Sequence, residues 1–129
     1  TQAEMNVEAG RRANVAQQQM ERAIVALKRS GWLEPPQISN LDKAQENWEV
    51  YAKAQAEFAA AEFEGGSMAP LVYASELESV TISRTGELNP RNEGTLRRLN
   101  FAGIRIKKTP ETLRQRGSGS FLSGPVEDR

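Results

Sequence analysis

Two adjacent glycines, Gly65 and Gly66, constrain the fold of this chain more than any other feature of its sequence. Residues before and after them show helical spacing of apolar side chains over the range 41–88. Glycine readily ends a helix, and Ser67 followed by Pro70 is typical of a helix start, where the missing N–H of proline does no harm. The range 41–88 therefore predicts a helical hairpin that holds most of the bulky apolar side chains.

The apolar residues of both arms recur every three or four positions, as on one face of a helix. The stripe expected to be buried in the first arm is Leu41, Ala44, Trp48, Tyr51 or Ala52, Gln55, Ala59 and Phe63. The stripe expected in the second arm is Leu71, Ala74, Leu77, Thr81, Thr85 and Leu88, with Tyr73, Val80 and Arg84 beside it. Ser39 or Asn40 is the expected cap of the first arm, because Pro35 and Pro36 favour a stiff connector before it.

An amino-terminal helix is expected over residues 2–29, ending at Ser30 and Gly31. Its expected stripe is Met5, Ala9, Ala13, Ala16, Met20, Ile24 and Leu27. Trp32 and Leu33 are expected to fold back over the end of this helix, with an exposed aromatic anchor for a partner as the alternative. Three helices joined in this way predict an all-α fold, an antiparallel three-helix bundle with an irregular basic extension after it.

The bulk composition fits one soluble domain of ordinary size. The chain has 129 residues, a hydrophobic content of 38% and a mean hydropathy of -0.61. No apolar run approaches the roughly 20 residues that a membrane-spanning helix needs. It begins at Thr1, which fits either a mature form after signal cleavage or a shortened chain. Cysteine and histidine are both absent, so disulfides, thiolate nucleophiles and Cys/His zinc sites are excluded.

Charge is distributed unevenly along the chain. Residues 1–88 hold 8 Lys/Arg against 13 Asp/Glu, a net charge of -5, and residues 89–129 hold 9 against 4, a net charge of +5. We therefore expect a helical domain over 1–88 and a basic, partly irregular extension over 89–129. Residues 95–108 fit a helical turn or a short extended piece, and 117–120 have linker composition. The simplest expectation is that the extension docks on the acidic body.

Few residues could carry chemistry. Glu62, Glu64, Glu76 and Glu78 could hydrolyse glycosides only if two of them faced each other across a cleft, and solvation on an acidic helix is the simpler explanation. Ser67 has no histidine to activate it, and the glycine turn lacks the spacing and lysine of a nucleotide-binding loop. No catalytic residue, cofactor or metal is expected.

The basic extension resembles a nucleic-acid patch in its charge only. The cations around Phe101 are Arg97, Arg98, Arg105, Lys107 and Lys108. They could neutralise several phosphates, but no recognised nucleic-acid motif accompanies them. We therefore expect no nucleic-acid partner.

The hairpin residues resemble the LprI-type lysozyme inhibitor domain, a small helical module of exported bacterial proteins that was long catalogued as a domain of unknown function. The residues that carry the resemblance are Gln45-x-x-Trp48-x-x-Tyr51, Gly65-Gly66-Ser67-Met68-x-Pro70-Leu71-x-Tyr73 and Thr81-x-x-Arg84-Thr85-x-Glu87-Leu88. The opening Thr1-Gln2-Ala3-Glu4-Met5-Asn6 resembles the start of the mature family domain, so the resemblance covers 1–88. The family usually carries cysteines where this chain has Glu8, Ala56 and Glu76, and an arginine where it has Ala52.

The resemblance implies a protein of the periplasm or cell exterior that acts by binding. Its implied partner is a lysozyme-like muramidase, blocked without covalent chemistry. The residues expected to bind the partner are Gly65, Gly66, Ser67, Met68, Tyr73 and Arg84. The alternative is an interaction or adaptor protein of the cell envelope that does not inhibit lysozyme and holds its partner through the basic extension.

Overall fold

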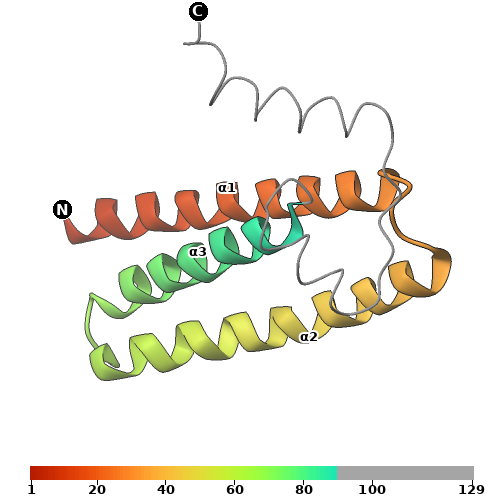
Figure 1. Ribbon diagram of the computed structural model, residues 1–129. Coiled ribbons are helices and arrows are strands. Elements are labelled where there is room, and N and C mark those ends of the chain that lie inside the picture. The colour runs from red at the N-terminus through yellow and green to blue at the C-terminus, as the bar shows by residue number, and fades with distance from the viewer. Residues whose placement is uncertain (90–129) are drawn as a thin grey trace, which may run out of the picture.

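The computed structural model describes residues 1–89 and contains three long helices (Figure 1). Helix α1 spans Gln2–Arg29, α2 spans Pro35–Ala60 and α3 spans Ala69–Leu88, with a short 3₁₀ helix η1 over Ala61–Phe63. The described residues form no strand, so the all-α class is confirmed. The expectations for the extension at 90–129 lie outside the described residues.

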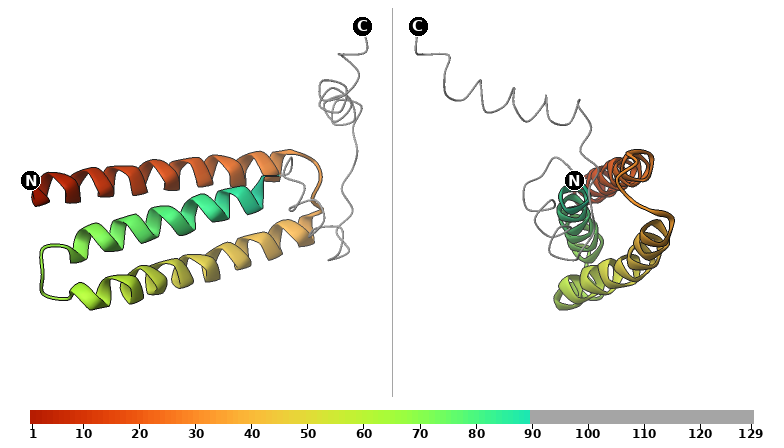
Figure 2. Two further views of the ribbon diagram at one scale, coloured as in Figure 1. Left: turned by 60° about the vertical axis from the view of Figure 1, so that its left-hand side comes forward. Right: turned by 45° about the vertical axis from the view of Figure 1, so that its right-hand side comes forward.

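Helix α3 lies between the other two. Consecutive helices run in opposite directions, and the views in Figure 2 show α3 between α1 and α2. Helix α3 packs extensively on both neighbours, whereas the backbones of α1 and α2 hardly approach each other. The predicted bundle is confirmed, with the last helix at its centre.

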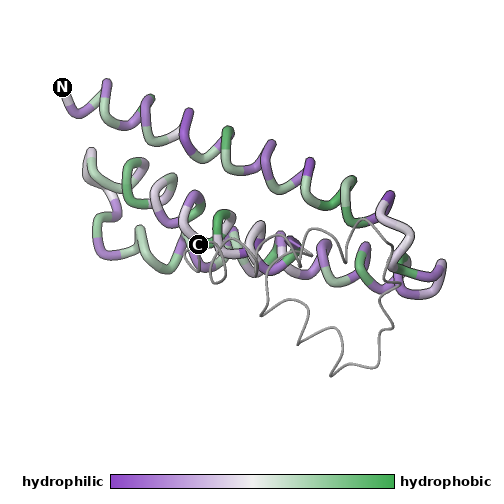
Figure 3. Tube along the Cα trace, turned by 45° about the horizontal axis from the view of Figure 1, so that its top comes forward, coloured by the Kyte–Doolittle hydropathy of each residue, from purple (hydrophilic) through white to green (hydrophobic). Residues whose placement is uncertain are grey.

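Hydrophobic and hydrophilic residues are interspersed along every helix (Figure 3), so each helix contributes only a narrow apolar stripe to the core. Most of the buried apolar side chains are alanines. One cluster joins Ala9 and Ala13 of α1 to Ala74 of α3. A second, bulkier cluster lies near the other end of the bundle, and its buried members are Met20, Leu27 and Leu88, with Ala23, Ile24, Leu33, Leu41 and Trp48 packed against them. Alanines let α1 and α3 approach closely, and the second cluster supplies most of the bulky apolar contact.

Helix α1 has the predicted bounds. Thr1 and Glu4 form a capping box at its start, and Gly31 follows its end with a φ of 79°. Trp32 is buried, as expected for a side chain that folds back over the helix end, so an exposed aromatic anchor at this position is excluded. The prediction was wrong for Met5, which is exposed because it lies near the free start of the helix, beyond the apolar clusters.

Helix α2 begins earlier than predicted. Pro35 and Pro36 occupy its first turn, where the fixed φ of proline suits a helix and no backbone N–H is required. The side-chain oxygen of Gln37 accepts a hydrogen bond from the backbone N–H of Glu34 at 2.6 Å, which closes this start. Ser39 and Asn40 are therefore interior residues of α2 and not its cap.

The buried face of α2 is also displaced from the predicted one. Ala52, not Tyr51, faces the core, together with Gln45 and Ala56. Of the other predicted members, Ala44 and Phe63 are exposed. Small residues on this face suit the close approach to α3, and the aromatic side chain of Tyr51 is left in solvent.

The start of α3 differs in one detail. Pro70 lies in its first turn as predicted, but Met68, not Ser67, is the N-cap residue and makes no side-chain capping bond. The described helices include none long and apolar enough to cross a membrane.

Candidate partner-binding site at the bundle tip

The connection between α2 and α3 forms an exposed turn at the end of the bundle where α1 begins (Figure 1). We call this turn, Glu64 to Met68, together with the first two turns of α1, the bundle tip. Gly65 has a φ of 82°, which an L-residue adopts only with strain. The backbone N–H of Gly66 donates to the carbonyl oxygen of Phe63 at 2.9 Å. The turn therefore requires a glycine at 65 and has a defined shape.

A side chain of α1 anchors this turn. The Nδ2 atom of Asn6 donates to the backbone oxygen of Ser67 at 3.2 Å, across 61 positions of sequence. Ser67 itself is exposed to solvent. The turn is thus held from both flanking helices and from α1, while its outer side faces solvent.

Apolar and acidic side chains surround the turn. Met5, Phe63 and Met68 are all exposed by more than a third. Residues 54–83 contain five glutamates and no lysine or arginine. The bundle tip therefore presents apolar contact area within an acidic half of the molecule, a combination suited to a basic protein partner.

The structure brings together five of the six residues expected to bind a partner. Gly65, Gly66, Ser67 and Met68 form the turn, and Tyr73, half-buried, lies in the second turn of α3 beside it. Arg84 is different: it follows Tyr73 by eleven residues, roughly 17 Å along a helix. Its side chain is only 13% exposed.

Arg84 belongs to a polar network that joins all three helices. Its Nε donates to Oε1 of Gln45 at 3.1 Å, and Nε2 of Gln45 donates to Sδ of Met20 at 3.4 Å. Arg84 also pairs with Glu87 at 3.2 Å. In the sequence, Gln45 stands out only as part of the family motif. Its position four residues after Leu41 places it on the same face of the helix as a residue expected to be buried, which is the signal for a contact between helices.

The candidate catalytic carboxylates do not converge. Glu76 accepts a hydrogen bond from Gln55 at 3.2 Å, and Glu78 pairs with Arg12 at 3.4 Å, whereas Glu62 and Glu64 lie exposed near the turn. Residues 1–89 contain no cluster of three or more potential metal ligands. These carboxylates therefore make structural contacts or face solvent.

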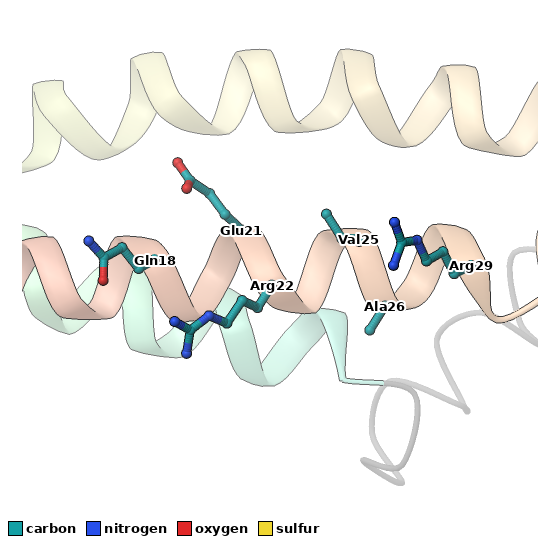
Figure 4. A pocket seen from close by; sticks show the side chains of 6 residues that line it. All are labelled: Gln18, Glu21, Arg22, Val25, Ala26 and Arg29. Carbon is teal, nitrogen blue, oxygen red and sulfur yellow. The ribbon is translucent and has the colours of Figure 1, made fainter.

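A shallow, open hollow of the described surface lies away from the bundle tip. It runs along the outer face of α1 and is lined by Gln18, Glu21, Arg22, Val25, Ala26 and Arg29 (Figure 4). Figure 4 shows these side chains leaving one helix in several directions, with Glu21 and Val25 on one side and Ala26 on the other. One helix cannot surround a ligand, so this hollow is not a candidate active site.

An ion-pair group links α1 to α3 below the bundle tip. Arg11 binds both carboxylate oxygens of Glu8 at 3.0 and 2.7 Å, and Arg12 lies between Glu8 and Glu78. The hydrogen bond from Arg11 lowers the pKa of Glu8, and the same bond raises the pKa of Arg11. The pair is exposed, so its contribution to stability is small.

Removing the arginine partner should restore the pKa of Glu8. Because folding lowers this pKa, the stabilisation that Glu8 provides is present above its ordinary value and is lost as the pH falls through the lowered one. In an Arg11→Gln variant, an NMR titration of the Glu8 carboxyl should give a pKa closer to its ordinary value than in the parent chain. An unchanged titration curve would show that the Glu8–Arg11 bond does not persist in solution.

The described residues form a small three-helix domain with an exposed turn of defined shape, and the four carboxylates considered as catalytic candidates do not converge. Comparison with protein families places it more closely: the model of the family "Lysozyme inhibitor LprI" matches residues 1–88. The chain therefore belongs to the LprI lysozyme inhibitor family, which is a family of inhibitors and not of enzymes. No curated protein and no solved structure matches the chain.

Two of the positions at which the resemblance implies family cysteines, 56 and 76, lie at the interface of α2 and α3. Ala56 is fully buried on the core face of α2. Glu76 of α3 contacts Gln55, the residue before Ala56. In this chain the burial of Ala56 and the Gln55–Glu76 hydrogen bond hold the two helices together at these positions.

Proposed function

We propose that this protein is exported to the periplasm or cell exterior, where it binds a lysozyme-like muramidase without covalent chemistry and blocks its substrate cleft. The family supports binding to such an enzyme. The observation that carries the proposal is the exposed turn at 64–68, which is held in one shape by Gly65 and by the Asn6–Ser67 hydrogen bond. A preorganised turn loses little conformational entropy when it enters a cleft.

The chemistry of the bundle tip suits a muramidase cleft. The hydroxyl of Ser67 can donate a hydrogen bond to a catalytic carboxylate at the bottom of the cleft. Phe63 and Met68 offer exposed apolar area on either side of that contact, and such anchors carry much of the energy of protein interfaces. Tyr73, half-buried in the second turn of α3, offers aromatic area near this contact, and Arg84 contributes indirectly by holding the helices in register.

Charge supports the choice of a basic partner. Residues 1–88 carry a net charge of -5, and five of their glutamates fall within 54–83, next to the turn. Many lysozymes are basic, so the encounter is electrostatically steered. The association rate should fall as ionic strength rises, because the Debye length shortens to about 3 Å at 1 M salt.

A muramidase turnover assay with increasing amounts of the protein tests the proposed function. Inhibition should saturate at one protein per enzyme. An enzyme rate that stays unchanged at micromolar concentrations of the protein, at low salt, would count decisively against it.

The role of the turn is tested separately. Replacing Ser67 with alanine should weaken inhibition roughly tenfold, the effect of losing a hydrogen bond to a charged group of about 1.5 kcal/mol. The matched control is Ser79→Ala, which removes another exposed serine from the middle of α3 and should leave inhibition unchanged. Equal inhibition by the two variants would rule out the proposed hydrogen bond of Ser67 to the enzyme, but it would not rule out the inhibitor function.

The uneven charge distribution favours a second candidate, an envelope adaptor that holds its partner through the basic residues 89–129. Deleting residues 90–129 distinguishes the two. A shortened chain that keeps its helicity and still inhibits a muramidase supports the first proposal, whereas a lost partner with intact helicity supports the adaptor.

A further inference from the structure

One face of α2 is apolar but covered by none of the described residues. Its members recur at helical spacing and are Val50, Tyr51, Ala54 and Phe58, which we call the outer α2 face. Val50 is 70% exposed, Tyr51 55% and Phe58 75%. Three large apolar side chains on a single face of one helix form a patch of the kind that usually marks a contact surface.

Acidic residues border the outer α2 face. Residues 35–64, which include α2, hold six Asp/Glu against two Lys/Arg. Glu57 and Glu62 flank Phe58 and take part in no ion pair within the described residues. The net charge of α1, on the opposite side of the bundle, is positive, because this helix holds three glutamates against five Lys/Arg. A basic and apolar occupant therefore fits α2 and not α1.

The chain carries a segment of this chemistry. Residues 95–108, Thr-Leu-Arg-Arg-Leu-Asn-Phe-Ala-Gly-Ile-Arg-Ile-Lys-Lys, include five bulky apolar side chains and five cations, with no Asp or Glu. We infer that this segment docks on the outer α2 face, with its apolar side chains against Tyr51 and Phe58 and its cations near Glu57 and Glu62.

The chain is long enough for this contact. Leu88, the last residue of α3, is buried in the cluster that Trp48 of α2 packs against. Phe58 lies ten residues beyond Trp48, which is about 15 Å along a helix. The twelve residue steps from Asn89 to Phe101 can span about 40 Å when extended.

The covalent connection favours the intramolecular occupant. A tether of this length raises the effective concentration of the segment at α2 to roughly the millimolar range. Opposite net charges of the two parts add a favourable long-range term. A separate partner would have to displace the segment, so docking also protects the exposed aromatic side chains from nonspecific association.

Paramagnetic NMR on the full chain tests the contact, because the absence of cysteine allows a single spin label to be placed at will. A nitroxide on an Ala61→Cys variant lies one turn beyond Phe58, at the edge of the outer α2 face. It should broaden the amide signals of 95–108 more than those of 120–129. The control label, on Gln18→Cys at the exposed side of α1, should broaden the signals of 95–108 much less.

Two double variants examine the outer α2 face itself. The double variant Tyr51→Ser with Phe58→Ser should reduce the broadening caused by the label at position 61 by at least half. The double variant Glu57→Lys with Glu62→Lys should also reduce this broadening. The second pair keeps the test informative if the first lowers helicity. Equal broadening from both label positions, or broadening that survives both double variants, overturns the docking. So does broadening of isotope-labelled chains by a separate spin-labelled copy, which would make a second molecule the occupant.

Discussion

Replacing Met20 with alanine is expected to lower the free energy of unfolding by about 3 kcal/mol. Met20 is 2% exposed and belongs to the bulkier of the two apolar clusters, which joins α1 to α3 and to Trp48 of α2. The substitution leaves a cavity in a core that otherwise depends on alanines. It also removes the sulfur that accepts a hydrogen bond from Gln45, a buried side chain that is bonded in turn to the part-buried Arg84. Urea denaturation followed by circular dichroism measures the change.

Met5→Ala provides the matched control. It removes the same side chain from the same helix, but Met5 is 50% exposed and outside both clusters. Exposed substitutions usually change stability by no more than about 0.5 kcal/mol. If Met20→Ala and Met5→Ala destabilised the protein equally, the cluster around Met20 would not be the main support of the bundle.

Introducing a cysteine pair between α2 and α3, at two of the positions that the resemblance implies, is expected to have an effect of similar size and opposite sign. In the double variant Ala56→Cys with Glu76→Cys, oxidation should raise the free energy of unfolding by about 3 kcal/mol relative to the same variant reduced, because it closes a loop of some twenty residues in the unfolded chain. Gln55, the residue before Ala56, donates a hydrogen bond to Glu76 at 3.2 Å, so position 76 lies beside this part of α2.

Comparing the oxidised and reduced forms of one variant separates the cross-link from the loss of the Glu76 contact. A second control pairs Ala54→Cys with Glu76→Cys, since Ala54 is exposed on a different side of α2. This pair should oxidise poorly without denaturant. Failure of the first pair to oxidise in the folded state would mean that positions 56 and 76 do not face each other.

Local signals made most of the fold predictable from the sequence. The bounds of α1 followed from its regular apolar stripe and from Gly31, and the hairpin followed from Gly65 and Pro70. These features act within a few residues: a glycine permits a positive φ, and a proline is tolerated only in the first turn of a helix.

The positions that were misassigned or left open depended on tertiary packing or on competing local effects. Pro35 and Pro36 can stiffen a connector or start a helix. Ser39 and Asn40, both good capping residues, favoured the connector, whereas the cap formed by Glu34 and Gln37 starts the helix at Pro35. Tyr51 and Ala52 are adjacent, so a periodic pattern places the buried stripe near both without choosing between them. Because α3 packs closely on α2, the smaller side chain, Ala52, occupies the buried position.

The candidate site was predictable in part. The exposed turn at 64–68 could be located from its glycines, but its anchor, Asn6, is 61 positions away from Ser67 and leaves no local signal. Arg84 was grouped with the turn because a family motif contains both. The structure places it in a largely buried network with Gln45, which only the packing of three helices creates.

Hydrogen exchange of the backbone amides, measured with and without an equimolar lysozyme-like muramidase, tests the central claim most directly. Binding through the bundle tip predicts slower exchange at residues 61–70 in the presence of the enzyme and no change at residues 18–29 of α1. Unchanged exchange at 61–70, or slowing confined to α1, would contradict the proposal that this end of the bundle enters the cleft of the enzyme.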